Sequence, residues 1–408
     1  MKVLVFNCGS SSLKYKLLEM PSARMLAGGE AQRVGPPTAQ PACIYHRTNG
    51  DQQQHQVDMP NHAVAFQEVM KLLTSDTRLA PDAVGHRMVH GGTRFADHAI
   101  VDEAVIGELE AIQDLAPLHN PPATALVRAC QSRYPHLPQV VVFDTAFHAA
   151  IPDYAYTYAL PRDLMSELGI RKYGFHGTSH QYVVEEAARL LDRPLDEFNA
   201  VSCHLGSGGA SLCAVVNGRS VDNTMGYSPL QGLMMSTRCG DLDPAVALQL
   251  LTFAGGDGDS VENLLNKRSG VLGMSGMSAD IRDVLASVEQ DADASPRLRR
   301  TVEAYVWRIR KYLGSYLATV GSADAIIFTD TIGETSPQVR WAVCAGMEVF
   351  GVSIDPARNI AATHLPADVA RDDSKVRILA IQTNEELAIA RRTFSMLSGA
   401  AGPLQKEH

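Results

Sequence analysis

Three segments of the chain share one arrangement, in which an apolar run leads through a polar residue into a loop of small residues. They read VLVFNCGSSS from residue 3, AVSCHLGSGGAS from residue 200 and AIIFTDTIGETS from residue 325. A short apolar run that ends in Gly and Ser is typical of a buried strand followed by a turn. The repetition predicts a duplicated fold in which each half carries a phosphate-holding hairpin. Chance similarity between strand–glycine junctions is the alternative.

The loop of the first segment has the chemistry of an anion site. Gly9 and the serines 10–12 offer backbone N–H groups and hydroxyls, and Lys14 adds a positive charge. Phosphate binds where many donors meet little steric bulk. An ordinary serine-rich hairpin would have the same composition.

Strand and helix signals alternate along the whole chain, which predicts an α/β architecture. Strands are expected at 3–6, 140–143, 200–203, 325–328 and 376–381, and a long helix at 295–320 with Ser295 as its cap. Thr178 with Gln181, and Thr383 with Glu386, are predicted capping boxes. The polar stretch 36–54 is expected to be a loop.

Size and composition limit the classes of function. A chain of 408 residues is long enough for two or three domains. A formal net charge of −9 without a basic run argues against a nucleic-acid-binding surface, so an anionic substrate would need local arginines and lysines. The seven scattered cysteines lack a CxxC pair and indicate reduced thiols in a cytoplasm. No apolar run is long enough for a signal peptide core or a membrane span.

Two segments carry candidate ligand-binding charges. GHRMVHGGTRF, at 85–95, contains Arg87, whose planar fork suits a carboxylate or phosphate. VVVFDTAFH, at 140–148, ends in Asp144 at the carboxyl end of a strand, where α/β sheets bind ligands. The alternatives are a buried Arg–Asp ion pair and an aspartate that caps the following turn.

Two loops carry candidate groups for an anionic transition state. RKYGFHGTSH, at 171–180, places His176 just before a helix, where it could donate to a transferring phosphoryl group. STRCGDLDP, at 236–244, places Arg238 beside Gly240. The alternatives are a loop histidine bonded to backbone and a surface arginine.

Taken together, the motifs resemble those of the acetate kinase family, which belongs to the superfamily of acetate and sugar kinases, actin and the heat-shock ATPases. NCGSSSLKY, GHRMVHGG, LAPLHNPP, VFDTAFH, YGFHGTSH, HLGSGG, STRCGDLDP and TNEELAIA occur in the family's order and spacing, from Met1 to about Arg392. The resemblance implies a two-domain duplicated actin-like ATPase fold, with ribonuclease H-like sheets around a central cleft. It places the first domain at 1–148, completed by the C-terminal helix 382–408, and the second at 149–381.

The activity implied by the resemblance is reversible, Mg-dependent, in-line transfer of the γ-phosphoryl group of ATP to acetate, which gives acetyl phosphate and ADP. Arg87 would hold the substrate carboxylate, and His176 and Arg238 would stabilise the transferring phosphoryl group. Asp144 would be the essential carboxylate. Asn7 and Glu385 would orient Mg²⁺, or Mn²⁺ in its place, and its waters. Acetate is already ionised at neutral pH, so no general base is required.

The resemblance also implies the residues that line the nucleotide and the methyl group. The methyl group would be enclosed by Val89, Leu118, Phe175 and Pro229. Val89 is expected to favour acetate over propionate, because propionate-preferring relatives tend to carry a smaller residue there. The nucleotide-binding set comprises Ser10, Ser12, Lys14, His204, Leu205, Gly206, Ser207, Gly208, Asp280, Ile281, Arg282, Thr331, Ile332, Gly333, Glu334 and Thr335.

This chain departs from the family on the nucleotide side. Ser207 and Thr335 replace asparagines, Thr331 replaces a glycine, and Asp330 replaces a small residue. A β-branched threonine at a positive φ would be strained, so the backbone at 331 is expected to differ or the loop to be displaced. Asp330 would add a negative charge near a polyphosphate, which is unfavourable unless a metal or a lysine offsets it.

Several alternatives therefore remain open. The phosphoryl donor could be pyrophosphate or another nucleotide, and the substrate could be propionate. A non-catalytic nucleotide-binding module would not need GHRMVHGG, FHGTSH or a second loop arginine. A sugar kinase would need a carboxylate base and a polar sugar site. By resemblance, the second domain is expected to carry a homodimer interface. Hinge closure is expected to exclude water from the site. The cysteines predict a cytoplasmic protein.

Overall fold

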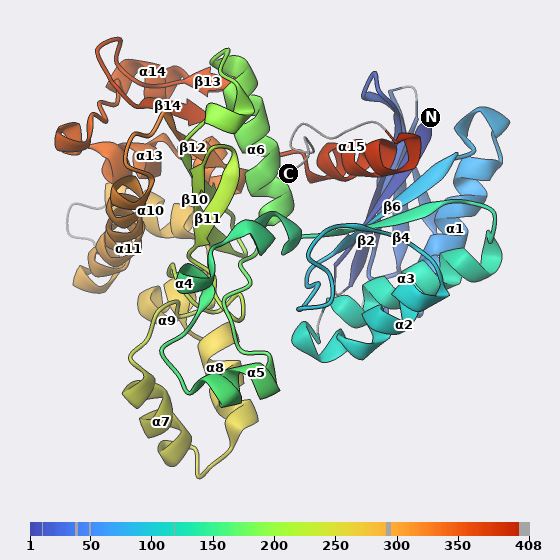
Figure 1. Ribbon diagram of the computed structural model, residues 1–408, viewed down its shortest axis with the longest axis horizontal. Coiled ribbons are helices and arrows are strands. Elements are labelled where there is room, and N and C mark those ends of the chain that lie inside the picture. Colours follow the sequence, from blue (N-terminus) through green and yellow to red (C-terminus); the bar gives the residue numbers. More distant parts are fainter. Residues whose placement is uncertain (10, 37–39, 49, 118, 291–294, 400–408) are drawn as a thin grey trace. The chain divides into compact units, whose positions relative to one another are not determined.

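The computed structural model describes residues 1–9, 11–36, 40–48, 50–117, 119–290 and 295–399, and it shows an α/β chain with two mixed sheets (Figure 1). The chain divides into two compact units. Unit 1 comprises Met1–Ala149 and the segment from Asn384 onward, and unit 2 comprises Ala150–Thr383. The candidate residues Ser10 and Leu118 lie outside the described residues.

The sheet of unit 1 has the strand order β5-β4-β3-β2-β1-β6-β8-β7. Strands β1, β6 and β8 are parallel, and the other pairings are antiparallel. The strands are β1 (Lys2–Cys8), β2 (Ser12–Glu19), β3 (Arg24–Gln32), β4 (Cys43–Thr48), β5 (Asp51–Gln56), β6 (Ala83–Met88), β7 (Ala99–Ile100) and β8 (Gln139–Phe143).

The prediction of a loop at 36–54 is wrong, because β4 and β5 form a hairpin at the edge of this sheet. Strand β5 has the sequence DQQQHQ and is almost wholly exposed. An edge strand with water on both faces needs no apolar alternation, so the sequence gives no strand signal there.

Helices cover both faces of the first sheet. Helices α1 (His62–Thr74), α2 (Glu103–Ala111) and α3 (Asn120–Arg133) share one core with the sheet, which includes Phe6, Phe66 and Leu126. Helix α15 (Glu385–Ser398) packs on the opposite face, where Ile389 and Ala390 meet apolar side chains of β1 and β8 (Figure 1).

The sheet of unit 2 has the order β11-β10-β9-β12-β14-β13. Its strands are β9 (Ala200–Leu205), β10 (Ala210–Val216), β11 (Arg219–Asn223), β12 (Ala325–Thr329), β13 (Ala367–Asp368) and β14 (Arg377–Ala380). This order and the strand directions repeat those of β3-β2-β1-β6-β8-β7 in unit 1. The predicted duplication is confirmed, and the hairpins β1–β2 and β9–β10 occupy equivalent places.

The third repeated segment differs from the other two. Strand β12 is the counterpart of β6 rather than of β1, and a short helix, α12 (Asp330–Thr335), follows it in place of a hairpin. The shared pattern therefore reflects strands that end at the same edge of a sheet, and only two of the three segments are hairpins.

Unit 2 is otherwise mainly helical. The long helix α11 (Pro296–Val320) packs on β10 and β9, and Ser295 caps it as predicted, accepting a hydrogen bond from the Arg297 N–H. Helix α6 (Gly177–Leu190) packs on β9 and β12. Helix α6, which covers the sheet of unit 2, follows β8, the last strand of the unit 1 sheet in the chain. Helix α15, which covers the sheet of unit 1, follows β14, the last strand of the unit 2 sheet. The remaining helices are α4 (Asp153–Tyr156), α5 (Arg162–Leu168), α7 (Pro244–Phe253), α8 (Gly258–Lys267), α9 (Gly270–Ser275), α10 (Ile281–Gln290), α13 (Pro337–Cys344) and α14 (Pro356–Ala361), with 3-10 turns at Thr77–Leu79, Gln113–Leu115, Ala146–Ala150, Leu195–Glu197 and Glu348–Phe350.

Both predicted capping boxes are wrong. Helix α6 begins one residue before Thr178, and its N-cap is His176, which has a left-handed backbone with φ of 57°. Helix α15 is capped by Asn384, whose side chain accepts from the Leu387 N–H at 3.2 Å. Asparagine is at least as good an N-cap as threonine, so Asn384 caps α15 in place of its neighbour Thr383.

All seven cysteines lie in described parts of the chain and are free thiols. Across the described residues, no helix combines the length and the apolar character that a membrane crossing needs.

Candidate active site

Three adjacent parallel strands of unit 1 each end in a candidate side chain. Asn7 lies in β1, Arg87 in β6, and Asp144 directly follows β8. The pairing of Phe6 with His86 and of Met88 with Phe143 brings these positions to one edge of the sheet. This is the carboxyl edge, where α/β sheets bind ligands.

Arg87 is the centre of this group. Its Nη2 donates to Asp144 Oδ2 at 2.7 Å, and its Nη1 donates to Asn7 Oδ1 at 3.2 Å. Glu385, the first residue of α15, joins them with Oε2 at 3.7 Å from Arg87 Nη1 and 3.4 Å from Asn7 Nδ2. We call Asn7, Arg87, Asp144 and Glu385 the unit 1 cluster.

The electrostatics of the unit 1 cluster keep its arginine charged. Burial alone would lower the pKa of Arg87, but the charges of Asp144 and Glu385 outweigh it, so that its pKa is raised. The Asp144 side chain is only 2% exposed and that of Arg87 20% exposed. The buried Arg–Asp ion pair that the sequence left as the alternative is therefore formed. It joins the two candidate residues, Arg87 and Asp144.

Further candidates of unit 1 lie close to this cluster in the chain. Val89 is half-buried, two residues beyond Arg87. In the β1–β2 hairpin, the Gly9 N–H donates to the Ser12 carbonyl at 2.9 Å, and Lys14 is exposed on β2 opposite Asn7. The hairpin thus leaves the Lys14 ammonium in solvent.

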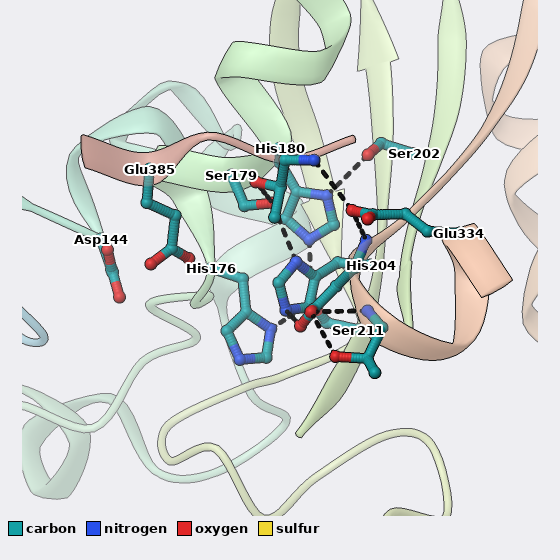
Figure 2. Close-up of polar contacts among 12 residues, drawn as sticks. Asp144, His176, Ser179, His180, Ser202, His204, Ser211, Glu334 and Glu385 are labelled. Carbon is teal, nitrogen blue, oxygen red and sulfur yellow. Dashed lines mark hydrogen bonds and ion pairs between the residues drawn. The ribbon is translucent and has the colours of Figure 1, made fainter. Parts of the chain in front are cut away.

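In unit 2, three histidines gather with three serines (Figure 2). The rings of His176 and His204 are stacked with centroids 4.1 Å apart, and the His180 ring lies 5.9 Å from that of His204. Ser179, Ser202 and Ser211 accept or donate hydrogen bonds at the ring nitrogens, at 2.8 to 2.9 Å. We call these six residues the histidine cluster.

Arg238 and His176 approach each other across a glycine. A Cβ on Gly209 would lie 3.3 Å from His176 Nε2 and 3.4 Å from Arg238 Nη1. Arg238 Nη1 is 3.4 Å from the carbonyl oxygen of Pro229, and Phe175 lies buried next to His176. The His176 ring and the Arg238 guanidinium therefore both border the space that a side chain at 209 would enter.

Arg238 differs from Arg87 in its partners. Among the described residues, no carboxylate forms an ion pair with Arg238, and its contacts are a carbonyl oxygen and the Met235 sulfur at 3.7 Å. Burial lowers the pKa of Arg238. A partly buried guanidinium with no counter-ion is suited to an anion supplied by a substrate.

His204 links the end of β9 to α12. Its Nε2 lies 2.9 Å from Asp330 Oδ2, and its Nδ1 lies 2.9 Å from Ser179 Oγ. Burial alone would raise the pKa of Asp330, but the hydrogen bond and charge of His204 outweigh it and hold that pKa well below its ordinary value. The group that lies against Asp330 is therefore a histidine rather than the expected metal or lysine. A side chain on Gly206 would run into the Asp330 carboxylate, so this close approach requires glycine.

The strain expected at Thr331 lies one residue earlier. Asp330 has the left-handed backbone, with φ of 62°, and Thr331 lies in the first turn of α12. The Thr331 N–H and hydroxyl both donate to Asp330 Oδ1, at 2.6 and 2.9 Å. Aspartate tolerates this conformation better than a β-branched residue does.

The other candidate residues of α12 make hydrogen bonds within unit 2 that fix the start of the helix. Glu334 Oε1 accepts from the backbone N–H groups of Asp330 and Thr383, each at 2.9 Å. The Thr335 hydroxyl donates to the Thr331 carbonyl, and Ile332 and Gly333 are buried. Arg340, only 1% exposed, donates to the carbonyls of Gly333 and Glu334.

The remaining candidates divide between strand, hairpin tip and helix start. Leu205 is buried at the end of β9, and Ser207 and Gly208 are exposed at the tip of the β9–β10 hairpin. Asp280 precedes α10 and accepts from the N–H and guanidinium of Arg282, whose hydrogen bond lowers the Asp280 pKa. Ile281 is buried.

The donor set of the unit 1 cluster suits a hard cation. Its carboxylates and the Asn7 carbonyl are oxygen ligands, and Mg²⁺ is usually held by one or two carboxylates while it keeps several waters. Within the described ranges, no group of three or more His, Cys, Asp and Glu side chains is placed to hold a metal ion. The residues therefore fit a partly hydrated Mg²⁺ rather than a closed cage.

Sequence reasoning did not single out Ser202 and Ser211, and it noted His180 only as part of RKYGFHGTSH. His180 is one helical turn after His176, which brings the two rings to the same side of α6. Ser202 and His204 are two residues apart on β9, so their side chains lie on the same face of the strand. Those two periodicities are the signal that could have found them.

Comparisons with known proteins are consistent along the whole chain. The family model described as the acetokinase family matches residues 2–391. The acetate kinase of Heliobacterium modesticaldum is 44% identical over 406 residues, which cover 98% of this chain and 100% of that protein.

Solved structures agree with the sequence matches. The crystal structure of Porphyromonas gingivalis acetate kinase has a TM-score of 0.89 at 38% identity and covers 97% of this chain and 99% of its own. A propionate kinase from Francisella tularensis has a TM-score of 0.87 at 35% identity, covering 96% and 98%.

Proposed function

The chain belongs to the acetokinase family, and from that premise we propose that it catalyses the reversible transfer of the γ-phosphoryl group of ATP to acetate, giving acetyl phosphate and ADP. In its class it is a phosphotransferase with a carboxyl group as acceptor. The finer assignments of substrate, donor, metal and site residues given below belong to the same proposal.

The observation that carries the proposal is the pair of donors around Gly209. Arg238 is partly buried without a carboxylate partner among the described residues, and its Nη1 and His176 Nε2 both border the space beside Gly209. In phosphoryl transfer the charge spreads over three equatorial oxygens, and fixed donors there lower the barrier. We assign His176 and Arg238 to this role.

The unit 1 cluster is assigned to the carboxylate substrate. One guanidinium edge of Arg87 is held by Asp144, and Nη1 is turned toward Asn7 and Glu385. Acetate is ionised at neutral pH, so its oxygen attacks the γ-phosphorus directly while the bond from phosphorus to the ADP oxygen breaks. The enzyme must orient two anions, acetate and ATP, against each other. Asp144 contributes by holding the Arg87 guanidinium in place.

Asn7 and Glu385 are assigned to Mg²⁺ or Mn²⁺, through the metal's waters. A divalent cation would neutralise the charge that develops on the phosphate oxygens. The chain's own contribution is to hold these oxygen ligands in place, through the contacts of Asn7 with Arg87 and Glu385.

The nucleotide is assigned to the hairpin tips and the start of α12. Ser12, Ser207, Gly208 and Thr331 lie at the carboxyl edges of their sheets, with backbone and hydroxyl donors. Asp330 is held by His204, with Nε2 and Oδ2 2.9 Å apart, so that its carboxylate is turned to a partner within the unit. We therefore retain ATP as the donor, with pyrophosphate and other nucleotides as outcomes of the test.

Acetate is proposed as the acceptor and propionate as a poorer one. Val89, Phe175 and Pro229 are assigned to the methyl group. One additional methylene changes the binding energy in an apolar pocket by only about 1–3 kcal/mol, so discrimination is expected to be partial.

A homodimer is proposed from the surface of unit 2. Helix α7 has no buried residue, and its apolar side chains Val246, Leu248, Leu251 and Phe253 are exposed. Exposed apolar patches of this kind mark interaction sites. Light scattering should show a dimer that Leu248→Glu with Phe253→Glu converts to a monomer; a wild-type monomer would exclude this assignment.

The seven free thiols support a reducing compartment, and we propose the cytoplasm.

The test is acetyl phosphate formation from acetate and Mg²⁺, with ATP, GTP or pyrophosphate supplied in parallel. ATP-dependent turnover that is lost in Arg238→Ala would support the proposal. Turnover with pyrophosphate alone would keep the chemistry and change the donor. A folded protein that forms no acetyl phosphate from any donor would overturn it.

A further inference from the structure

We infer that Ser202, His180 and Ser211 form a one-way chain of hydrogen bonds that holds His176 in the tautomer with its proton on Nε2. These three would be positioning residues, because they act on the phosphoryl group only through His176. The assignment of a catalytic consequence rests on the proposed function, whereas the tautomer itself follows from the contacts.

The chain of contacts is continuous (Figure 2). Ser202 Oγ lies 2.9 Å from His180 Nδ1, and His180 Nε2 lies 2.8 Å from Ser211 Oγ. Ser211 Oγ lies 2.9 Å from His176 Nδ1. Ser202, His180 and Ser211 are each 0% exposed, so water does not compete for these bonds.

Ser211 couples the two rings, because a hydroxyl has one hydrogen to donate. Of the nitrogens His176 Nδ1 and His180 Nε2, one accepts that hydrogen and the other must donate an N–H to the oxygen. For neutral rings, a proton on His180 Nε2 therefore implies an unprotonated Nδ1 and a protonated Nε2 on His176. The opposite arrangement reverses both rings.

Ser202 decides between these two arrangements. In the described part of the chain, His180 Nδ1 is the only hydrogen-bond partner of its hydroxyl. A buried hydroxyl hydrogen without an acceptor is unfavourable by about 1–3 kcal/mol. Ser202 therefore donates to His180 Nδ1, and His180 carries its proton on Nε2.

The chain then ends at His176 Nε2–H. A Cβ on Gly209 would lie 3.3 Å from this nitrogen and 3.4 Å from Arg238 Nη1. A phosphoryl oxygen accepts hydrogen bonds and has none to give, so the reversed tautomer would present a lone pair to it. The buried serines thus make His176 a donor without requiring it to be charged.

The tautomer can be read directly by two-bond ¹H–¹⁵N spectra of protein labelled with ¹⁵N-histidine. His176→Gln and His180→Gln identify the two sets of signals. In the wild type we expect a protonated Nε2 and an unprotonated Nδ1 for both rings. A protonated Nδ1 on His176 would overturn the inference, whatever the enzyme's activity.

Kinetic variants test the consequence. Ser211→Ala should lower kcat by about tenfold to a hundredfold, the range seen when a positioning partner is lost, with KM for acetate changed by about twofold or less. Ser211→Thr keeps the hydroxyl and should recover kcat, and Ser202→Ala should give mixed tautomers and a smaller loss. Ser220→Ala, at a buried serine on β11, is the matched control.

Thermal unfolding of each variant separates a folding defect from a lost tautomer. If Ser211→Ala is folded, keeps the wild-type His176 signals and keeps its kcat, the chain of hydrogen bonds has no positioning role. If the wild type makes no acetyl phosphate at all, the proposed function fails while the spectra still decide the tautomer.

Discussion

His204 Nε2 and Asp330 Oδ2 are 2.9 Å apart, so that the end of β9 is fastened to the first residue of α12. The pair lets Asp330 remain ionised while it is largely buried. By the resemblance to acetate kinases, Asp330 is also a residue expected to depart from the family pattern.

Replacement of Asp330 by asparagine should make the protein less sensitive to acid. The folded-state pKa of Asp330 is below its ordinary value of 3.8. Its contribution to stability is therefore complete above that value and is lost as the pH falls toward the lower folded-state pKa. At pH 7 Asp330→Asn should lower the free energy of unfolding by about 1–2 kcal/mol, and the difference should shrink below pH 4. Urea unfolding at both pH values measures this.

The matched control for this prediction is Asp373→Asn, at an exposed aspartate. It should change neither the stability at pH 7 nor its dependence on pH. A variant at Asp330 that loses stability on acidification as steeply as the wild type would contradict the assigned role of the ion pair.

Loss of Arg238 should reduce activity without reducing stability. The guanidinium is partly buried and lacks a carboxylate partner among the described residues, so its removal leaves no charge unpaired. We expect Arg238→Gln to lower kcat by about a hundredfold to a thousandfold while the melting temperature is unchanged or higher. Steady-state kinetics and calorimetry measure the two quantities, and a fall in melting temperature would argue for a structural arginine.

Loss of Arg87 should have the opposite effect on stability. Asp144 is 2% exposed, and Arg87→Ala would leave its carboxylate without the guanidinium. We expect destabilisation by about 3–5 kcal/mol, most of which Asp144→Asn in the same chain should recover. A double-mutant cycle in urea measures the coupling. Purely additive effects would show that the ion pair is not what holds the unit 1 cluster.

Truncation of Val89 should change acceptor selectivity. Val89→Ala provides room for one more methylene, and the ratio of kcat/KM for propionate to that for acetate should rise by about tenfold. Val101→Ala, at a partly buried valine in the packing around the unit 1 core, controls for general loosening. An unchanged ratio would remove Val89 from the proposed acceptor pocket.

The alternation of strands and helices was predictable because central strands, buried on both faces, are continuous apolar runs such as 140–143 and 325–328. The edge strand β5 was not, since its DQQQHQ sequence is polar on both faces. The N-cap of α15 was predicted at the wrong residue because two good capping residues, Thr383 and Asn384, are adjacent.

The candidate site divides in the same way. Asp144 could be proposed because it stands at the end of a recognisable strand, Arg87 because of its guanidinium in GHRMVHGGTRF, and Asn7 through the resemblance to acetate kinases. The bond from Ser211 to His180 joins residues far apart in the chain and depends on the register of β9 with β10, which composition does not specify. The left-handed residue at 330 rather than 331 likewise depends on where α12 begins.

The crossing of the last helix onto the first sheet has a consequence for synthesis. Ile389 and Ala390 of α15 complete the apolar layer over Val3, Val5, Val140 and Val142. On the ribosome, these valines are translated long before the helix that covers them, whereas every residue of unit 2 precedes α15. The N-terminal sheet is therefore the first to emerge and the last to be finished, and a chain that stops before Asn384 would present that layer to chaperones.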